Sequence, residues 1–294
     1  MQTGIASEYK GLRDLYVSDG GAFAGKPGAR IDILKNKTYE YDGYITGKKS
    51  GIVTPIGNFL DDPGNLYVAD QDAVNIKEYA LGATSPTFTY NASMNSPEDV
   101  SVDRAGNVYE ADYRRPGSFV NEYAQESNKV IHTCSTGNGA ISIAVDQKGD
   151  VFVDTLTQIL EYKGGLVGCY ATVLGVSFPN SGGGGMALDN HDDIIVTVTG
   201  YNGTGYGATV DIIAPPYKSV TRTLGEGDYA TPQSVRISKK NRLVFVSDIG
   251  FPAEGSPGHV FVFSYPAGAL VATLGGAYGV ITPYCAVDGP NSVY

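Results

Sequence analysis

A repeated pair of short β-strands constrains the fold of this chain more than any other feature. Each copy has an alternating apolar run, a turn rich in Asp, Gly and Asn, and a second run that usually ends in Asp, as in 98–112. One position of the second run recurs at intervals of about 40 to 50 residues. Its occupants are Tyr16, Tyr67, Tyr109, Phe152, Ile195, Phe245 and Tyr294. Two more runs of period 2 follow, for example 75–80 and 87–91, so each repeat holds four strands.

Four strands per repeat of this length are typical of a β-propeller blade. We therefore predict an all-β fold, a six-bladed β-propeller with four-stranded antiparallel blades, formed by one domain over residues 1–294. Strands a to d run from the axis to the rim. Five complete blades are expected to begin near Val53, Ser96, Gly139, Gly182 and Thr231. The sixth takes strand a from 283–288 and its other strands from 15–44, so the N- and C-terminal strands share one blade and close the ring. Either 13–19 or its duplicate 289–294 could pair there.

The composition excludes several classes of protein. With 21 Lys and Arg against 31 Asp and Glu, the net charge of −10 predicts no nucleic-acid partner. No apolar run is long enough for a membrane span, and the first residues lack the apolar core of a signal peptide. Few basic residues and much Gly, Thr, Tyr and Asn favour an exported protein, extracellular or periplasmic, which we expect to be a monomer. Tyr recurs in strands b and c, which indicates blade packing.

The three cysteines are odd in number and far apart, at Cys134, Cys169 and Cys285. No C-x-x-C pair occurs, which argues against a zinc knuckle or a redox motif. We interpret all three as small buried hydrophobic residues.

The segments Pro97–Asp112 and Pro55–Ile76 resemble the NHL repeat, with its Asp, its Gly-Asn turn and its Tyr-x-Ala-Asp ending. Over nearly the whole chain the pattern is similar to that of the six-bladed propellers of the gluconolactonase/regucalcin-like and NHL-type superfamily. The resemblance implies ligand binding over the channel, on the face where the d–a and b–c loops meet, called the top face here. That superfamily contains lactonases, arylesterase-like hydrolases, lyases and binding modules, and the fold does not choose among them.

Three long b–c loops, at 20–29, 200–207 and 249–258, belong to blades that are neighbours once the ring closes. They predict a continuous wall on the top face, rich in Gly and aromatic residues. The alternative is that they are surface insertions without a ligand. The contact candidates on the wall are Phe23, Tyr201, Tyr206 and Phe251.

The starts of the a strands should line the channel mouth. The candidates there are Asn58, Glu98, Asp99, Ser142, Gln233 and Tyr284, with Tyr113 on a neighbouring loop. Carboxylate and amide oxygens suit a hard cation such as Ca²⁺. The metal-dependent lactonases that this chain resembles use a Glu, Asn and Asp set, which Glu98, Asn58 and Asp99 match in type.

Two further features of the sequence, a glycine run and a recurrent Asp, have structural interpretations. The glycine run 182–185 is interpreted as a flexible connection between blades, or alternatively as a set of bare N–H groups that could hold an anion. The Asp that ends strand b recurs too often for a catalytic residue. We predict that its carboxylate accepts N–H groups of the b–c turn. Its copies are Asp19, Asp70, Asp112, Asp154 and Asp248.

No nucleophile motif and no converging histidine set is visible, since His132, His191 and His259 fall on different parts of the blades. The first hypothesis is therefore an exported scaffold that binds a small molecule or a protein through its top face. The alternative is a hydrolase or lyase of the lactonase/arylesterase-like type, with a divalent cation at the channel mouth.

Overall fold

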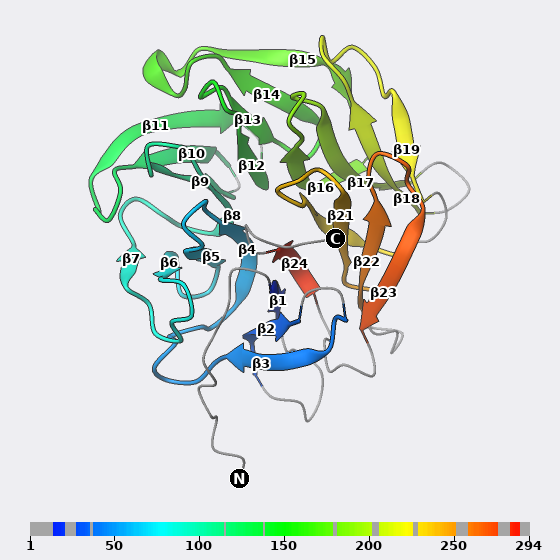
Figure 1. Cartoon of the computed structure of the whole chain (residues 1–294). Helices are drawn as coiled ribbons and strands as arrows, with labels where there is room; N and C mark the ends of the chain where they lie inside the picture. The colour runs from blue at the N-terminus through cyan, green and yellow to red at the C-terminus, as the bar shows by residue number, and fades with distance from the viewer. Residues whose placement is uncertain are drawn as a thin grey trace.

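Six four-stranded antiparallel sheets surround a common axis in the computed structural model of the chain, which confirms the predicted six-bladed propeller (Figure 1). The structure describes residues 14–20, 28–35, 38–114, 116–137, 139–178, 181–201, 206–225, 229–250, 258–275 and 283–288. Of residues 181–183, 201, 206, 283, 284, 286 and 288 only the backbone is described. The inner strands β4, β8, β12, β16, β20 and β24 contact one another in that order around the ring, and β24 contacts β4 again.

The closing blade is split between the two ends of the chain, as predicted. It has the order β24 (Pro283–Asp288), β1 (Leu15–Asp19), β2 (Arg30–Leu34) and β3 (Tyr41–Ile45). The pairing of β1 with β24 places Leu15 opposite Asp288 and Val17 opposite Ala286. Strand β1, which lies within the predicted segment, is thus the neighbour of β24.

The other five blades are continuous in sequence, and their strands are as follows. The first contains β4 (Pro55–Leu60), β5 (Leu66–Asp70), β6 (Asn75–Tyr79) and β7 (Phe88–Tyr90). The second contains β8 (Pro97–Val102), β9 (Val108–Asp112), β10 (Ser118–Tyr123) and β11 (Val130–Gly137). The third contains β12 (Ser142–Val145), β13 (Val151–Asp154), β14 (Gln158–Tyr162) and β15 (Ala171–Ser177). The fourth contains β16 (Ser181–Leu188), β17 (Ile194–Tyr201), β18 (Tyr206–Ile213) and β19 (Arg222–Leu224). The fifth contains β20 (Pro232–Ile237), β21 (Leu243–Asp248), β22 (His259–Ser264) and β23 (Leu270–Gly275).

A capping side chain fixes each of these a–b turns on the bottom face. In the first blade, Asp61 Oδ1 accepts the N–H groups of Gly64 and Asn65 at 2.8 and 2.7 Å. Asp103, Asp146 and Asp189 cap the next three turns in the same way. Ser238 replaces the aspartate in the fifth blade, where its hydroxyl accepts two N–H groups. This local chemistry sets the hairpin between strands a and b in every continuous blade.

The Asp that ends strand b is structural, but its partners differ from the prediction. Asp70 accepts the N–H groups of Val53 and Thr54, which precede strand a of the same blade. Asp112 and Asp248 likewise accept N–H groups of the d–a connection. Only Asp154 and Asp248 accept an N–H group of the b–c turn within the described residues. In these three blades, the carboxylates of Asp70, Asp112 and Asp248 therefore tie the entry of the blade to its second strand.

Tyrosine fills the spaces between blades, as its recurrence in strands b and c predicts. Tyr67, Tyr79, Tyr90, Tyr123 and Tyr162 are among the largest fully buried side chains. Several of them also reach a polar partner with the hydroxyl, since Tyr79 donates to Ser50 O at 2.8 Å and Tyr123 to Ala92 O at 2.7 Å. Tyr79 and Tyr123 thus contribute both apolar packing and a hydrogen bond.

The glycine run at 182–185 is not a flexible connection: it is part of the inner strand β16. A Cβ on Gly185 would lie 2.4 Å from Ser234 Cα and 2.7 Å from Val235 N. A Cβ on Gly184 would meet Thr197 Oγ1 at 2.0 Å and Pro232 O at 2.9 Å. The missing side chains allow β16 to approach the backbone of β20, which explains why the sequence needs glycine here.

We expect Gly185→Ala to lower the free energy of unfolding by about 2 kcal/mol, because overpacking against backbone atoms forces strands apart. Denaturant titration measures the effect. Gly28→Ala is the matched control, since a Cβ at that glycine meets nothing within 4 Å. Equal stability of the two variants would contradict the close approach of β16 and β20.

The predicted wall of long top loops is only partly described. The loop 200–207 is shorter than predicted, because β17 and β18 continue to Tyr201 and Tyr206 and pair there. Phe23 and Phe251 lie outside the described residues, and so do most of the other two loops.

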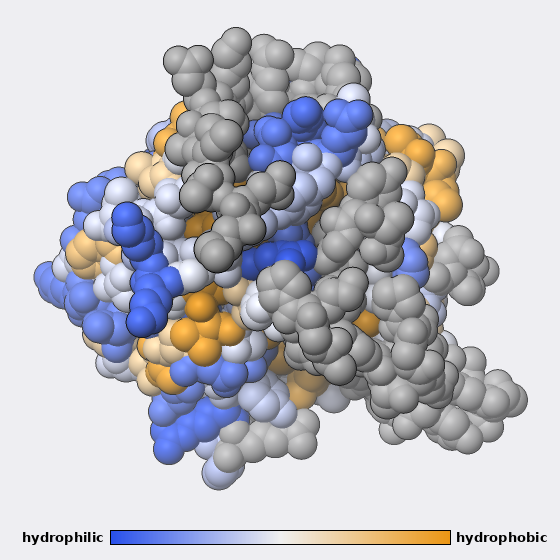
Figure 2. Space-filling model, turned by 90° about the horizontal axis from the view of Figure 1, so that it is seen from below, coloured by the Kyte–Doolittle hydropathy of each residue, from blue (hydrophilic) through white to orange (hydrophobic). Residues whose placement is uncertain are grey.

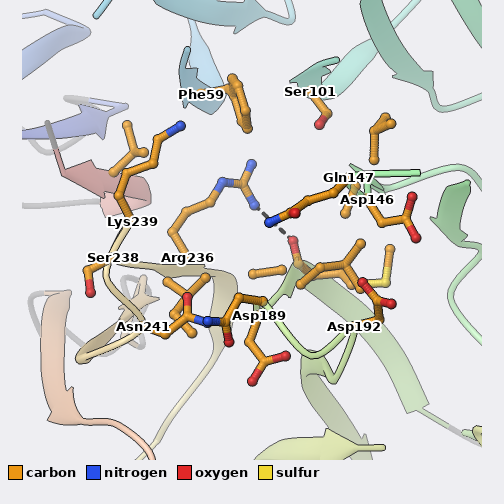
Figure 3. Close-up of a pocket in the computed structure, with 18 of the residues that line it drawn as sticks. Phe59, Ser101, Asp146, Gln147, Asp189, Asp192, Arg236, Ser238, Lys239 and Asn241 are labelled. Carbon is orange, nitrogen blue, oxygen red and sulfur yellow. Dashed lines mark hydrogen bonds between the residues drawn. The ribbon is translucent and has the colours of Figure 1, made fainter. Parts of the chain in front are cut away.

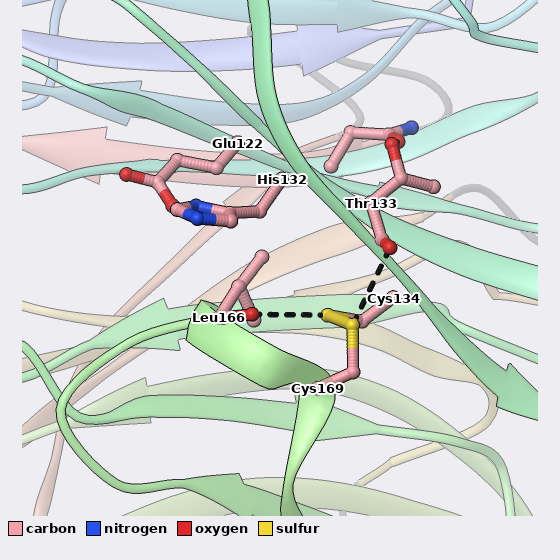
Figure 4. Close-up of a disulfide and its surroundings, with 7 residues drawn as sticks. Glu122, His132, Thr133, Cys134, Leu166 and Cys169 are labelled. Carbon is pink, nitrogen blue, oxygen red and sulfur yellow. Dashed lines mark hydrogen bonds and ion pairs between the residues drawn. A yellow bond between two sulfur atoms is a disulfide. The ribbon is translucent and has the colours of Figure 1, made fainter.

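Two of the cysteines form a disulfide, which corrects their interpretation as separate buried hydrophobic residues (Figure 4). The bond joins Cys134 of β11 to Cys169 of the 3-10 turn η2 (Val167–Cys169). Cys134 is buried and Cys169 is exposed. The bond therefore links the rims of two adjacent blades. Cys285 is the free, buried cysteine and lies on β24.

The outer surface is mixed in polarity. Seen from the edge of the ring, hydrophilic residues cover much of the described surface, and hydrophobic ones form small separate patches (Figure 2). None of the described residues belongs to a helix with the length and hydropathy needed to cross a membrane.

Candidate functional site

A cavity of about 230 Å³ lies at the top of the channel, where the inner strands begin. We call it the top cup. Its lining comes from the starts of five a strands and from two b–c loops. It consists of Ile56, Gly57, Glu98, Asp99, Tyr113, Ile141, Leu156, Gly184, Gly185, Gln233 and Ser234. The cup therefore forms where the repeat places the first residues of successive blades side by side.

A buried ion pair between Arg236 and Asp99 closes the channel beneath the top cup. Arg236 is on β20 and 6% exposed, and its guanidinium donates to Asp99 Oδ1 across the axis. It also donates to the carbonyl oxygens of Asn58, Met186 and Val235, each at 3.1 Å. One side chain thus ties the inner strands β4, β8, β16 and β20 together. Arg236 also lines a second cavity below, where Figure 3 shows it among the lining residues.

Asp99 is held equally firmly on its other sides. Its Oδ2 accepts the Ser142 hydroxyl at 2.6 Å and the Ile143 N–H at 3.2 Å, and its Oδ1 accepts the Val100 N–H at 2.9 Å. The Ser142 hydroxyl in turn accepts the Met186 N–H at 2.9 Å. Asp99 and Ser142 therefore join three adjacent inner strands, which is a structural role.

Asn58 completes the layer on the opposite side of the ring. It is fully buried, and its Nδ2 donates to Ser18 Oγ at 3.0 Å and to Cys285 O at 3.3 Å. Ser234 donates to Cys285 Sγ at 3.2 Å. These contacts connect the closing blade to both of its neighbours. The layer formed by Asn58, Asp99, Ser142 and Arg236 is called the axial layer below.

Glu98 is the carboxylate of the top cup that the axial layer does not neutralise. Its Oε1 accepts Gln71 Nε2 at 2.5 Å and the Ser96 hydroxyl at 3.2 Å. Burial raises the pKa of Glu98 to about 7, and the charges of Asp99 and Asp112 act in the same direction. Its contribution to folding stability is therefore fully present below its ordinary pKa of 4.5 and is lost as the pH rises through about 7.

A second carboxyl group is buried behind Glu98 in the same blade. Glu110 of β9 is fully buried, and its Oε2 accepts Asn121 Nδ2 at 2.8 Å. Burial raises the pKa of Glu110 well above its usual range, and the charges of Asp112 and Glu98 add to the shift. Burial therefore favours the neutral form of Glu110.

The residues predicted to hold a cation do not fit one. The guanidinium of Arg236 contacts Asp99, so it occupies a position where Asp99 would face a metal ion. Asn58 directs its amide nitrogen toward the closing blade. Within the described part of the chain, no three His, Cys, Asp or Glu side chains are grouped as metal ligands. His132, His191 and His259 lie apart, in β11, an a–b turn and β22.

The structure sorts the predicted contact residues into three groups. Glu98, Asp99, Tyr113 and Gln233 line the top cup. Asn58 and Ser142 are fully buried in the axial layer beneath it. The remaining candidates are outside the described residues or are described by backbone only, and they are Phe23, Tyr201, Tyr206, Phe251 and Tyr284.

Sequence reasoning missed Arg236, which has the central position. A signal was available, because Arg236 is the one basic residue within an otherwise uncharged strand a, PQSVRI. Arg236 is two residues after Ser234, so both lie on the same face of the strand, the one toward the axis. Ile56 and Leu156 form an apolar part of the wall of the top cup, and nothing in the sequence sets them apart from other apolar residues.

Comparisons with known proteins support the fold. No protein-family model and no curated protein matches the chain. Among solved structures, it is similar to a protein of unknown function from Bacteroides caccae, with a TM-score of 0.67 and 12% identity over 94% of this chain and 98% of that chain. It is also similar to hydrazine synthase of Kuenenia stuttgartiensis, with a TM-score of 0.65 and 11% identity over 99% of this chain and 93% of that chain. At these identities the likeness shows the fold alone.

Proposed function

We propose that this chain is an exported, NHL-like binding propeller whose top cup holds a small organic ligand. The observation that carries the proposal is the charge of the cup: Asp99 is matched by Arg236, whereas Glu98 has neutral partners, Gln71 and Ser96. A ligand with N–H donors, and an ammonium group above all, complements such a site. A protein partner would use the same face by inserting a lysine or an N-terminal amine.

The closed floor and the disulfide support this proposal in different ways. Because the axial layer blocks the channel, the top cup is a blind site that can bury most of a small ligand. Export is proposed because disulfides persist in oxidising compartments. The Arg236 guanidinium holds Asp99, so the metal-dependent hydrolase alternative lacks one of its proposed ligands.

Binding of an ammonium ligand should strengthen with pH, because Glu98 must be ionised to attract it. We expect the affinity for benzylamine, the probe, to rise about tenfold between pH 5.5 and 8.5. Benzyl alcohol, its neutral counterpart, should show no such rise. Glu98→Gln should remove the pH dependence for benzylamine. Isothermal titration calorimetry at the two pH values measures both affinities.

The matched control is Glu126→Gln, which removes an exposed carboxylate from the β10–β11 connection. This variant should retain the rise in affinity. If benzylamine does not bind, or if Glu98→Gln keeps the pH dependence, the proposed role of Glu98 in the top cup is wrong.

A further inference from the structure

A second cavity, of about 240 Å³, lies beneath the axial layer at the bottom mouth of the channel (Figure 3). We call it the bottom cup. Its walls are mainly apolar and include Phe59, Ile143, Met186, Leu188 and Val287. The a–b turns of three blades surround its opening. It is separate from the top cup, because Arg236 lines only the bottom cup and Asp99 only the top cup.

Two groups at the inner end of the bottom cup offer hydrogen atoms. Ser101 of β8 is 3% exposed and lines the cavity, and its hydroxyl has no hydrogen-bond partner among the described residues. Figure 3 shows this hydroxyl directed toward the centre of the cup. Arg236 makes four hydrogen bonds within the described structure, whereas a guanidinium carries five N–H groups. A third donor, Nδ2 of Asn241, also lines the cup and is buried without a hydrogen-bond partner in the described structure. A buried polar group without a partner is rare in folded proteins, so its place in a cavity points to a ligand.

The charges around the bottom cup select against anions. Arg236 is matched by Asp99, and Lys239 at the opening is paired with Asp62 at 2.6 Å. Asp146 and Asp189 also line the cup, and neither forms an ion pair with a lysine or arginine of the described chain. The site is thus apolar on its walls, rich in donors at its inner end and negative at its opening.

From this arrangement we infer that the bottom cup binds a small apolar molecule that presents an uncharged oxygen acceptor, such as a ketone or an amide carbonyl, to Ser101 and Arg236. The apolar part of the ligand lies against Phe59, Ile143 and Met186. A carboxylate of the same shape is rejected, because Asp146 and Asp189 repel it and the arginine already has a counter-ion. The inference does not depend on the top cup.

Three aromatic probes test the inference: acetophenone, benzoate of nearly the same shape, and toluene, which has no oxygen. Acetophenone should bind with a Kd of about 1 mM, as expected for a ligand of this size. Toluene should bind more weakly and benzoate should not bind. Ser101→Ala should weaken acetophenone binding about three- to tenfold and leave toluene unchanged, because it removes one hydrogen bond to a neutral acceptor. Ligand-observed NMR titrations provide the affinities.

Ser101→Ala should fold normally, since it removes a hydroxyl without a partner, and thermal unfolding checks this. Leu188→Trp, at the edge of the cup, should abolish binding of both probes by filling the cavity. Glu98→Gln should leave acetophenone binding unchanged, which separates this site from the top cup. The inference is overturned if Ser101→Ala binds acetophenone as tightly as the natural chain does, or if benzoate binds as well as acetophenone.

Discussion

Replacing Arg236 by methionine is expected to lower the free energy of unfolding by about 3–5 kcal/mol. The substitution leaves the Asp99 carboxylate buried at 3% exposure without its counter-ion. It also frees the carbonyl oxygens of Asn58, Met186 and Val235 inside the channel. Buried acceptors without donors add to the loss. Urea titration monitored by tyrosine fluorescence measures the change.

A double variant separates the ion pair from the packing of the arginine. Asp99→Asn combined with Arg236→Met removes both charges, so it should be less destabilised than Arg236→Met alone. Lys240→Met serves as the control, because Lys240 is exposed on the same β20–β21 turn region. If Arg236→Met and Lys240→Met unfold at the same urea concentration, the axial layer does not hold the ring together as described.

Loss of the disulfide is expected to lower stability by about 2–4 kcal/mol, chiefly because the unfolded chain gains freedom. The bond closes a loop between cysteines 35 residues apart in sequence. Cys169→Ser is the sharper variant, since Cys169 is exposed and its replacement leaves the buried packing of Cys134 in place. Thermal unfolding with and without dithiothreitol measures the effect.

The response of Cys169→Ser to dithiothreitol is the control in this experiment, because that variant has no disulfide to reduce. It should destabilise the natural chain to the level of Cys169→Ser and leave that variant unaffected. If dithiothreitol has no effect on the natural chain, Cys134 and Cys169 are not joined in the folded protein. Cys285→Ala should respond to dithiothreitol as the natural chain does, because Cys285 takes no part in the bond.

The order of the blades was predictable because it follows from local signals that repeat. The capping residues Asp61 and Asp103 accept N–H groups a few residues away. Tyrosines such as Tyr67 and Tyr79 occupy buried positions that follow the period of 2 of a strand. The split of the closing blade also follows from the repeat, since strand a is missing at the N-terminal end and present at 283–288. The number and order of the strands in each repeat could thus be inferred from the sequence.

Features that depend on contacts between blades could not be inferred in this way. The repeat places Glu98 and Gln233 at the channel mouth, and both line the top cup. It does not tell whether a carboxylate there meets solvent or a cation from another blade, so the repeat alone does not distinguish Asp99, which Arg236 pairs, from Glu98. The disulfide could not be predicted for the same reason, since Cys134 and Cys169 meet only because two blade rims lie side by side.

The pairing of β1 with β24 has a consequence for biosynthesis. The two strands are almost the full described length of the chain apart, so the ring stays open on the ribosome until residues 283–288 emerge. Until then β1 exposes an unpaired edge, and Asn58 lacks its contact with Cys285. Such non-local closure is slow relative to the formation of each blade from neighbouring hairpins. An unfinished chain therefore carries its main risk of association with other chains at this one seam, rather than evenly around the ring.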